Sequence, residues 1–94
     1  MLEGKKAIVT GGIRGIGFAC AEEFCRQGAD VLVTYHSNDE TAAEAAKKLR
    51  AYGTNVVLSK GDVADDSYVK KAVSDFAKEA GSVDILVNNA GITR

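Results

Sequence analysis

The sequence predicts an α/β fold in which helices cover both faces of a parallel sheet. Three observations predict it. Strand-like apolar runs alternate with helix-like segments, the runs lack polar–apolar alternation, and a glycine-rich turn follows the first run. Strands separated by helices imply right-handed crossovers, and therefore parallel pairing. The expected strand order is 3-2-1-4, the first half of a larger sheet whose second half is absent.

The first predicted strand is Lys6–Thr10, and a helix over Gly15–Gln27 follows it. Gly28 is expected to end this helix in a left-handed conformation. Helical spacing predicts that one apolar face of the helix is buried. We expect this face to contain Ile16, Ala19, Cys20 and Phe24. The second strand is predicted over the β-branched run Val31–Tyr35.

The second predicted helix begins with a capping box. Ser37 is the expected N-cap, and Glu40 follows three residues later. The helix is predicted to run to about Tyr52 and to stop at Gly53. Its predicted inward residues are Ala42, Ala45, Ala46 and Leu49.

The third strand is predicted over Asn55–Ser59, and either Asp65 or Asp66 is expected to cap the helix after it. Gly81 is the expected end of that helix, and Asp84–Val87 is the fourth predicted strand. Apolar residues recur at helical spacing between the cap and the end. They are Val69, Ala72, Val73, Phe76, Ala77 and Ala80.

Composition limits what the chain can do. Its 94 residues make one small domain at most, and a net charge of −1 favours neither nucleic acid nor an anionic membrane as a partner. Met1–Lys6 precedes no long apolar stretch, so we expect neither a secretory signal nor a membrane span. Cys20 and Cys25 lack C-x-x-C spacing and are expected to be reduced thiols of a cytoplasmic protein. His36 is the single histidine of the chain, and no cluster of metal-ligand residues surrounds it in the sequence, so no metal site is expected.

The segment Thr10–Gly17 has the spacing T-G-x-x-x-G-x-G between a strand and a helix. Unpaired N–H groups and the dipole at a helix N-terminus favour an anion, and glycine lets a pyrophosphate approach the backbone. The turn therefore predicts a dinucleotide site. We expect its lining residues to be Gly11, Gly12, Ile13, Arg14, Gly15, Ile16 and Gly17.

The predicted strand order reverses between the first and fourth strands, so a crevice opens at their carboxyl ends. The glycine turn and the Asn88–Gly91 loop are expected to form opposite walls of this crevice. This arrangement is Rossmann-like. We therefore expect residues 1–94 to be the N-terminal, cofactor-binding part of a single Rossmann-fold domain.

The end of the second strand distinguishes the two nicotinamide cofactors, because an acidic residue there binds the ribose 2′-hydroxyl and repels a 2′-phosphate. This end holds Thr34, Tyr35, His36 and Ser37, with no carboxylate until Asp39. Arg14 in the glycine turn supplies a guanidinium suited to a phosphate. We therefore favour NADP(H) over NAD. The alternative is that Arg14 is solvated and Tyr35 only packs against adenine.

Two further loops carry candidate cofactor contacts. Asp62 can accept a hydrogen bond from the adenine amino group while Val63 lies against the ring; alternatively, Asp62 caps the next turn. Asn88 and Asn89 can contact the ribose or satisfy neighbouring backbone groups. Gly91 allows close approach of a ligand or makes a turn.

Taken together, Thr10–Gly17, Asp62-Val63 and Asn88–Gly91 resemble the short-chain dehydrogenase/reductase family over the whole chain. The ending Asp84–Arg94 is similar, more narrowly, to bacterial 3-oxoacyl-(acyl-carrier-protein) reductases. The resemblance places Arg14 at the NADP 2′-phosphate. It also implies that Asn88 and Thr10 brace the loops, and that the cofactor is lined by Asn89, Ala90 and Gly91.

The resemblance implies NADPH-dependent reduction of a 3-oxoacyl thioester in fatty acid biosynthesis, by a cytoplasmic homotetramer that accepts acyl-carrier-protein thioesters. The family's catalytic Ser, Tyr-x-x-x-Lys and Asn lie beyond the Asn88–Gly91 loop. Tyr35, Tyr52 and Tyr68 all lack a lysine four residues later. We therefore expect no catalytic residue in this chain, and no activity from these 94 residues alone.

Other interpretations remain open. Tyr35-His36-Ser37 also resembles the sugar-dehydrogenase branch, so a sugar or alcohol dehydrogenase is an alternative. A non-catalytic NADP-binding module and a truncated version of the enzyme are two others. We also expect the fourth strand to be an exposed edge, which predicts marginal stability and either dimerisation through that edge or a partner segment docked on it.

Overall fold

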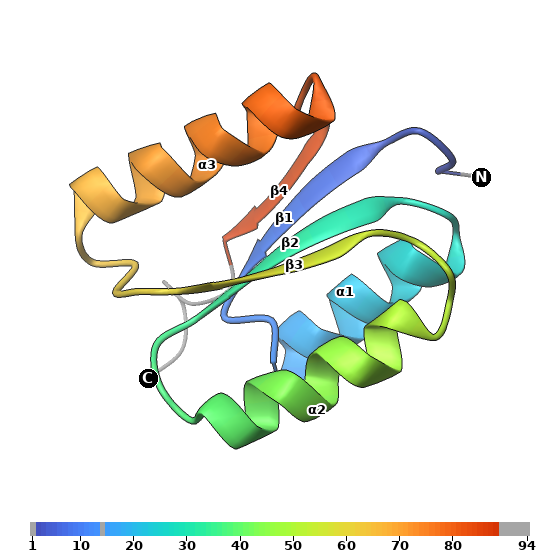
Figure 1. Cartoon of the computed structure of the whole chain (residues 1–94), viewed down its shortest axis with the longest axis horizontal. Coiled ribbons are helices and arrows are strands. Elements are labelled where there is room, and N and C mark those ends of the chain that lie inside the picture. Colours follow the sequence, from blue (N-terminus) through green and yellow to red (C-terminus); the bar gives the residue numbers. More distant parts are fainter. Residues whose placement is uncertain (1, 14, 89–94) are drawn as a thin grey trace.

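The structure, a computed structural model, describes residues 2–13 and 15–88 (Figure 1). Strands and helices alternate along the chain as the sequence predicts, with ends that differ by a few residues at most. The elements are β1 (Lys6–Thr10), α1 (Gly15–Arg26), β2 (Asp30–Tyr35), α2 (Asp39–Arg50), β3 (Val56–Lys60), α3 (Asp66–Ala80) and β4 (Ile85–Asn88).

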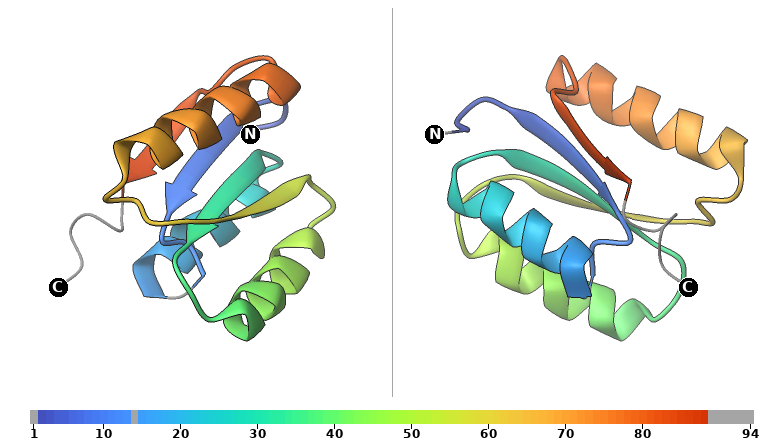
Figure 2. Two further views of the ribbon diagram at one scale, coloured as in Figure 1. Left: turned by 60° about the vertical axis from the view of Figure 1, so that its left-hand side comes forward. Right: turned by 180° about the vertical axis from the view of Figure 1, so that it is seen from behind.

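The four strands form one parallel sheet in the order β3-β2-β1-β4, which confirms the predicted order. Helices α1 and α2 cover one face of the sheet and α3 lies on the other (Figures 1 and 2). All four carboxyl ends therefore meet at one edge. The glycine turn leaves the end of β1 at this edge, next to the end of β2.

The core between the sheet and α1 and α2 is built from small and β-branched side chains. Its fully buried members include Val9, Val31, Val33, Ala42 and Leu49. The predicted inward face of α2 is confirmed, because the buried residues of that helix are Ala42, Ala45, Ala46 and Leu49.

The predicted buried face of α1 is wrong in part. The buried residues are Gly17, Ala21 and Cys25, whereas Ile16 is 73% exposed and Ala19 is also exposed. Cys20 and Phe24 are half-buried, and Phe24 packs beside the core. The small residues at spacings of four let the helix lie close to the β-branched side chains of the sheet, so packing distance outweighed side-chain size.

The other face of the sheet carries a smaller core, in which Phe76 of α3 covers Ile8 and Leu32. Asp65 caps α3 through hydrogen bonds from the N–H groups of Ser67 and Tyr68, and Gly81 ends it at φ 94°. Both features agree with the sequence. The helical positions predicted to face inward are all buried or half-buried.

The predicted N-cap of α2 is wrong by one residue. Asn38, not Ser37, precedes the helix, and its side-chain oxygen accepts a hydrogen bond from the Thr41 N–H at 3.1 Å. Asn38 has φ 67°, a left-handed conformation that excludes it from the helix. The capping box starting at Ser37 would need Asn38 inside the helix. Asparagine tolerates the left-handed region better than most residues, so the turn forms there.

Candidate functional site

The glycine turn between β1 and α1 is held on the end of β2. The Gly11 N–H donates to both the carbonyl and the hydroxyl oxygen of Thr34 at 3.1 Å, and the Gly12 N–H donates to the same carbonyl at 3.3 Å. Gly11 has φ 68°, which favours glycine. The sequence places Thr34 at the end of this strand but did not predict that it holds the turn. The available signal was a hydroxyl side chain at the last buried position of the strand.

Gly12 has no space for a side chain. A Cβ built there would lie 2.8 Å from Val33 Cγ1 and 3.2 Å from Val9 Cγ1. The turn is therefore packed directly on β1 and β2, and Gly12 and Ile13 are buried. Gly15 and Ile16, which begin α1, are exposed.

The first turn of α1 can receive an anion. Gly15 has φ 63° with nothing near its Cβ position, and no acidic residue lies in the first turn. The first N–H groups of a helix lack intrahelical partners, and the dipole adds partial positive charge. Exposed glycine at this point leaves the backbone accessible to a phosphate group.

A small pocket of about 100 Å³ lies beside the turn, between the ends of β2 and β3. Five predicted site residues line it: Gly11, Tyr35, His36, Asp62 and Val63. Thr34 and Gly61 complete it. The structure thus brings three separate predicted segments together. Ser37 is exposed beyond His36 and does not line this pocket.

Asp62 has a structural role in the turn after β3. Its Oδ1 accepts a hydrogen bond from the Ala64 N–H at 2.9 Å, and its carbonyl oxygen accepts one from the Asp65 N–H at 2.9 Å. This is the turn-capping alternative. The residue is nevertheless exposed and also lines the pocket.

A row of polar side chains ends the four strands on the α3 face. Thr10 pairs in register with Thr34 and Asn88, and Thr34 pairs with Ser59. The Thr10 hydroxyl donates to Asn88 Oδ1 at 3.2 Å and so joins β1 to β4. These are the two residues expected to brace the loops. The Ser59 hydroxyl is 2.6 Å from the hydroxyl of Tyr68. The row spans all four strand ends.

Tyr35, Asp39 and Lys60 form a second polar group at the ends of β2 and β3. The Tyr35 hydroxyl donates to Asp39 Oδ1 at 3.0 Å, and Lys60 Nζ lies 3.2 Å from the same oxygen. The hydrogen bonds from Lys60 and then Tyr35 lower the pKa of Asp39. Partial desolvation and the bond to Asp39 raise the pKa of Tyr35. The carboxylate is therefore stabilised in its charged form.

Several predictions lie outside the described residues: those for Arg14, Asn89, Ala90 and Gly91. Within the described ranges, no cluster of three His, Cys, Asp or Glu residues could hold a metal ion. None of the helices there has the length and apolar character needed to cross a bilayer.

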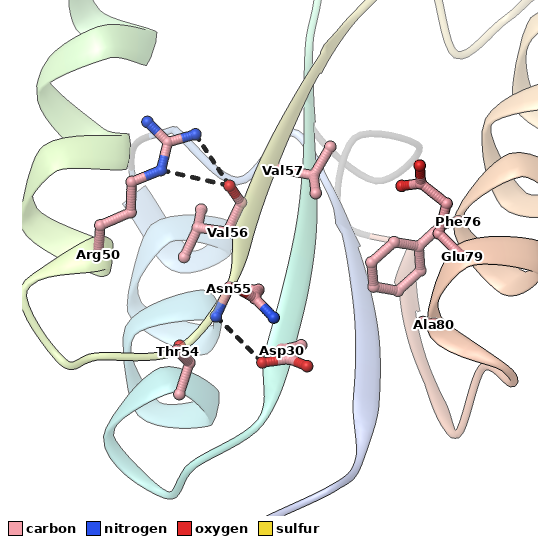
Figure 3. Close-up of a pocket in the computed structure, with 9 residues that line it drawn as sticks. All are labelled: Asp30, Arg50, Thr54, Asn55, Val56, Val57, Phe76, Glu79 and Ala80. Carbon is pink, nitrogen blue, oxygen red and sulfur yellow. Dashed lines mark hydrogen bonds between the residues drawn. The ribbon is translucent and has the colours of Figure 1, made fainter.

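The larger pocket in Figure 3, of about 420 Å³, lies elsewhere. It runs along the outer edge of β3, between Val57 and the α3 residues Phe76, Glu79 and Ala80. Asp30, at the start of β2, also lines this pocket. The pocket therefore reaches the amino ends of the strands, away from the glycine turn. On the other side of β3, the Arg50 guanidinium donates to the Val56 carbonyl at 2.9 and 3.3 Å. This edge shares no lining residue with the pocket beside the turn.

Comparison with known proteins gives a consistent result. The protein-family model described as short chain dehydrogenase matches residues 5–94 of this chain. General stress protein 39 from Bacillus subtilis is 41% identical over 96% of this chain and 32% of its own length. A 3-oxoacyl-(acyl-carrier-protein) reductase from Staphylococcus aureus is 39% identical over 96% of this chain and 37% of its own. The chain thus spans about a third of these curated relatives.

A solved structure has the same arrangement of elements. A short chain dehydrogenase from Burkholderia cenocepacia J2315, in complex with NADP, superposes with a TM-score of 0.91. It is 45% identical in sequence, and the match covers 99% of this chain and 38% of that one.

Proposed function

Because this chain belongs to the short-chain dehydrogenase family, we propose that it forms the NADP(H)-binding part of an enzyme that reduces a 3-oxoacyl thioester to a 3-hydroxyacyl thioester. The family-level conclusion, an oxidoreductase with a Rossmann-like fold, rests on the match over residues 5–94. The substrate rests on similarity to the reductase from Staphylococcus aureus and on the ending Asp84–Arg94.

The observation that carries the proposal is the glycine turn held against β2 beside the open start of α1. A pyrophosphate placed there would accept hydrogen bonds from the N–H groups at the start of α1, because those of Gly11 and Gly12 already donate to Thr34. The residues assigned to the cofactor are Gly11, Gly12, Ile13, Arg14, Gly15, Ile16, Gly17, Tyr35, His36, Ser37, Asp62, Val63, Asn89, Ala90 and Gly91.

We assign the pocket beside the turn to the adenosine end of the cofactor, with adenine between the end of β2 and the Asp62-Val63 segment. The family resemblance assigns Arg14 to the ribose 2′-phosphate. The β2 end carries no carboxylate at residues 34–37, which favours the phosphorylated cofactor.

Catalysis in this family requires a proton donor that we do not assign to any residue of these 94. When bound, NADPH provides a hydride for the substrate carbonyl. The family's proton donor is a tyrosine of a Tyr-x-x-x-Lys motif, and Tyr35, Tyr52 and Tyr68 do not match that motif. We therefore propose that the 94 residues alone bind cofactor without turnover. Assembly as a cytoplasmic homotetramer and use of acyl-carrier-protein thioesters belong to the same proposal.

The proposal is tested by titrating the protein with NADPH and with NADH, followed by cofactor fluorescence. We expect tighter binding of NADPH. Arg14→Ala should weaken NADPH by about 1.5–3 kcal/mol, the range for charge-assisted contacts, and leave NADH little changed. Equal losses for the two cofactors would remove the phosphate role of Arg14. Absence of binding by either cofactor would contradict the proposed function.

A further inference from the structure

The ion pair between Asp39 and Lys60 lies at the corner of the site where the two nicotinamide cofactors differ. Asp39 is the first carboxylate after the end of β2, four residues beyond Tyr35. Tyr35 lines the pocket beside the glycine turn and donates its hydroxyl hydrogen to Asp39. The carboxylate is therefore one hydrogen bond away from the pocket wall.

Lys60 reaches this carboxylate from the neighbouring strand. It ends β3, pairs in register with Tyr35, and directly precedes the pocket residue Gly61. Its Nζ lies 3.2 Å from Asp39 Oδ1 and 3.3 Å from Oδ2, so both oxygens contact the ammonium. The Gly61 N–H donates to the Tyr35 carbonyl at 2.9 Å, which fixes the two strand ends together.

An unpaired carboxylate here would oppose a phosphorylated ribose. Solvent only partly screens the repulsion between a carboxylate and a nearby phosphate at a protein surface. A free carboxylate near this strand end also suits a ribose 2′-hydroxyl. Pairing with an ammonium makes the local charge of Asp39 and Lys60 close to zero. The hydrogen bond from Tyr35 occupies part of the remaining acceptor capacity.

We propose that Lys60 is a specificity-determining residue that favours adenosine 2′-phosphates by neutralising and holding Asp39. Lys60 acts through Asp39 and does not itself contact the phosphate. This inference rests on the proposed binding of NADP(H), and it assigns a role to a residue that the cofactor-binding set does not include.

The test uses two ligands that differ by the 2′-phosphate alone, adenosine 2′,5′-bisphosphate and 5′-AMP. Their dissociation constants are measured by calorimetry for the wild type, Lys60→Met, Asp39→Asn and the double variant. Lys60→Met leaves one net negative charge, so the bisphosphate should bind about fivefold more weakly while 5′-AMP stays within about twofold. Asp39→Asn should bind the bisphosphate at least as tightly as the wild type.

The double variant carries the decisive result. It has the same net charge at this corner as the wild type, so its affinity for the bisphosphate should return to within about twofold of the wild-type value. Lys60→Arg should retain wild-type discrimination. Lys71→Met is the matched control, because Lys71 forms an equivalent exposed pair with Asp75 on α3. It should change neither dissociation constant.

Three results would overturn the inference. They are equal weakening of both ligands by Lys60→Met, no effect of that variant, and a double variant as weak as Lys60→Met. The last result would mean that Lys60 contacts the phosphate itself. Failure of the proposed function is a separate outcome, since the wild type would then bind neither nucleotide.

Discussion

Gly12 is packed between the side chains of Val9 and Val33, and this contact sets the position of the whole turn. We predict that Gly12→Ala destabilises the protein by about 1–3 kcal/mol, because the new methyl group overlaps Val33 Cγ1. Chemical denaturation measures the loss. In the double variant Gly12→Ala/Val33→Ala the two losses should be less than additive, because Val33→Ala opens space for the new methyl group. A Gly12→Ala variant as stable as the wild type would show that the turn is not held as described.

Asp30 joins the amino ends of three strands. Its carboxylate accepts from Lys6 Nζ on β1 and from the Asn55 N–H before β3. Desolvation raises the pKa of Asp30, but the bonds from Lys6 and Asn55 outweigh it, so the pKa lies below its usual value of 3.8. Unfolding releases these bonds and returns the pKa toward that value.

The folded pKa of Asp30 is depressed, so its contribution to stability is complete above pH 3.8 and is lost as the pH falls through the folded value. We predict that Asp30→Asn lowers the free energy of unfolding at pH 7 and flattens its decline between about pH 5 and pH 2. Urea denaturation across this range measures both. An unchanged slope in the variant would show that Asp30 does not link stability to pH.

At the scale of single elements, the start of α2 gives a direct comparison of two neighbouring residues. Asn38→Ala removes the cap on Thr41 and places a Cβ-bearing residue without a polar side chain at φ 67°. We predict a loss of about 1–2 kcal/mol. Ser37→Ala is the control and should stay within about 0.5 kcal/mol, because Ser37 lies outside the helix. The reverse ranking would restore the capping box at Ser37.

Helices α1 and α2 show what the sequence could and could not predict. Existence and order of strands and helices were predictable, because apolar runs and glycine stops are local signals. The buried face of α1 was not, since Ile16 and Phe24 are the larger apolar residues, yet close approach to the sheet selected Gly17, Ala21 and Cys25. The cap at Asn38 depends on a left-handed backbone conformation, which the residue types of Ser37 and Asn38 do not predict.

The candidate site was predicted to a similar extent. Segments that carry glycine, Asp62 and the end of β2 were identified by spacing, and the structure brings them to one pocket. Thr34, Tyr68 and Lys60 were missed because their roles come from cross-strand register and from packing between elements. No spacing along the chain records that Tyr35 pairs with Lys60.

At the scale of the whole molecule, β4 pairs with β1 at one edge of the described sheet, and Leu86 on it is 58% exposed. An open strand edge beside an apolar side chain favours pairing with another chain. We predict that a polypeptide of these 94 residues self-associates through β4, and that Leu86→Lys reduces this. Sedimentation velocity measures it. Monomeric wild type that unfolds cooperatively at high temperature would contradict the expectation.

The glycine turn, the start of α1 and the pocket at the ends of β2 and β3 converge on one edge of the molecule. A crystal structure of the protein with NADP tests their common purpose most directly. We predict that the pyrophosphate lies within hydrogen-bond distance of the N–H groups at the start of α1, with adenine between Tyr35 and Val63. Nucleotide bound at another edge, with the turn making no phosphate contact, would contradict it.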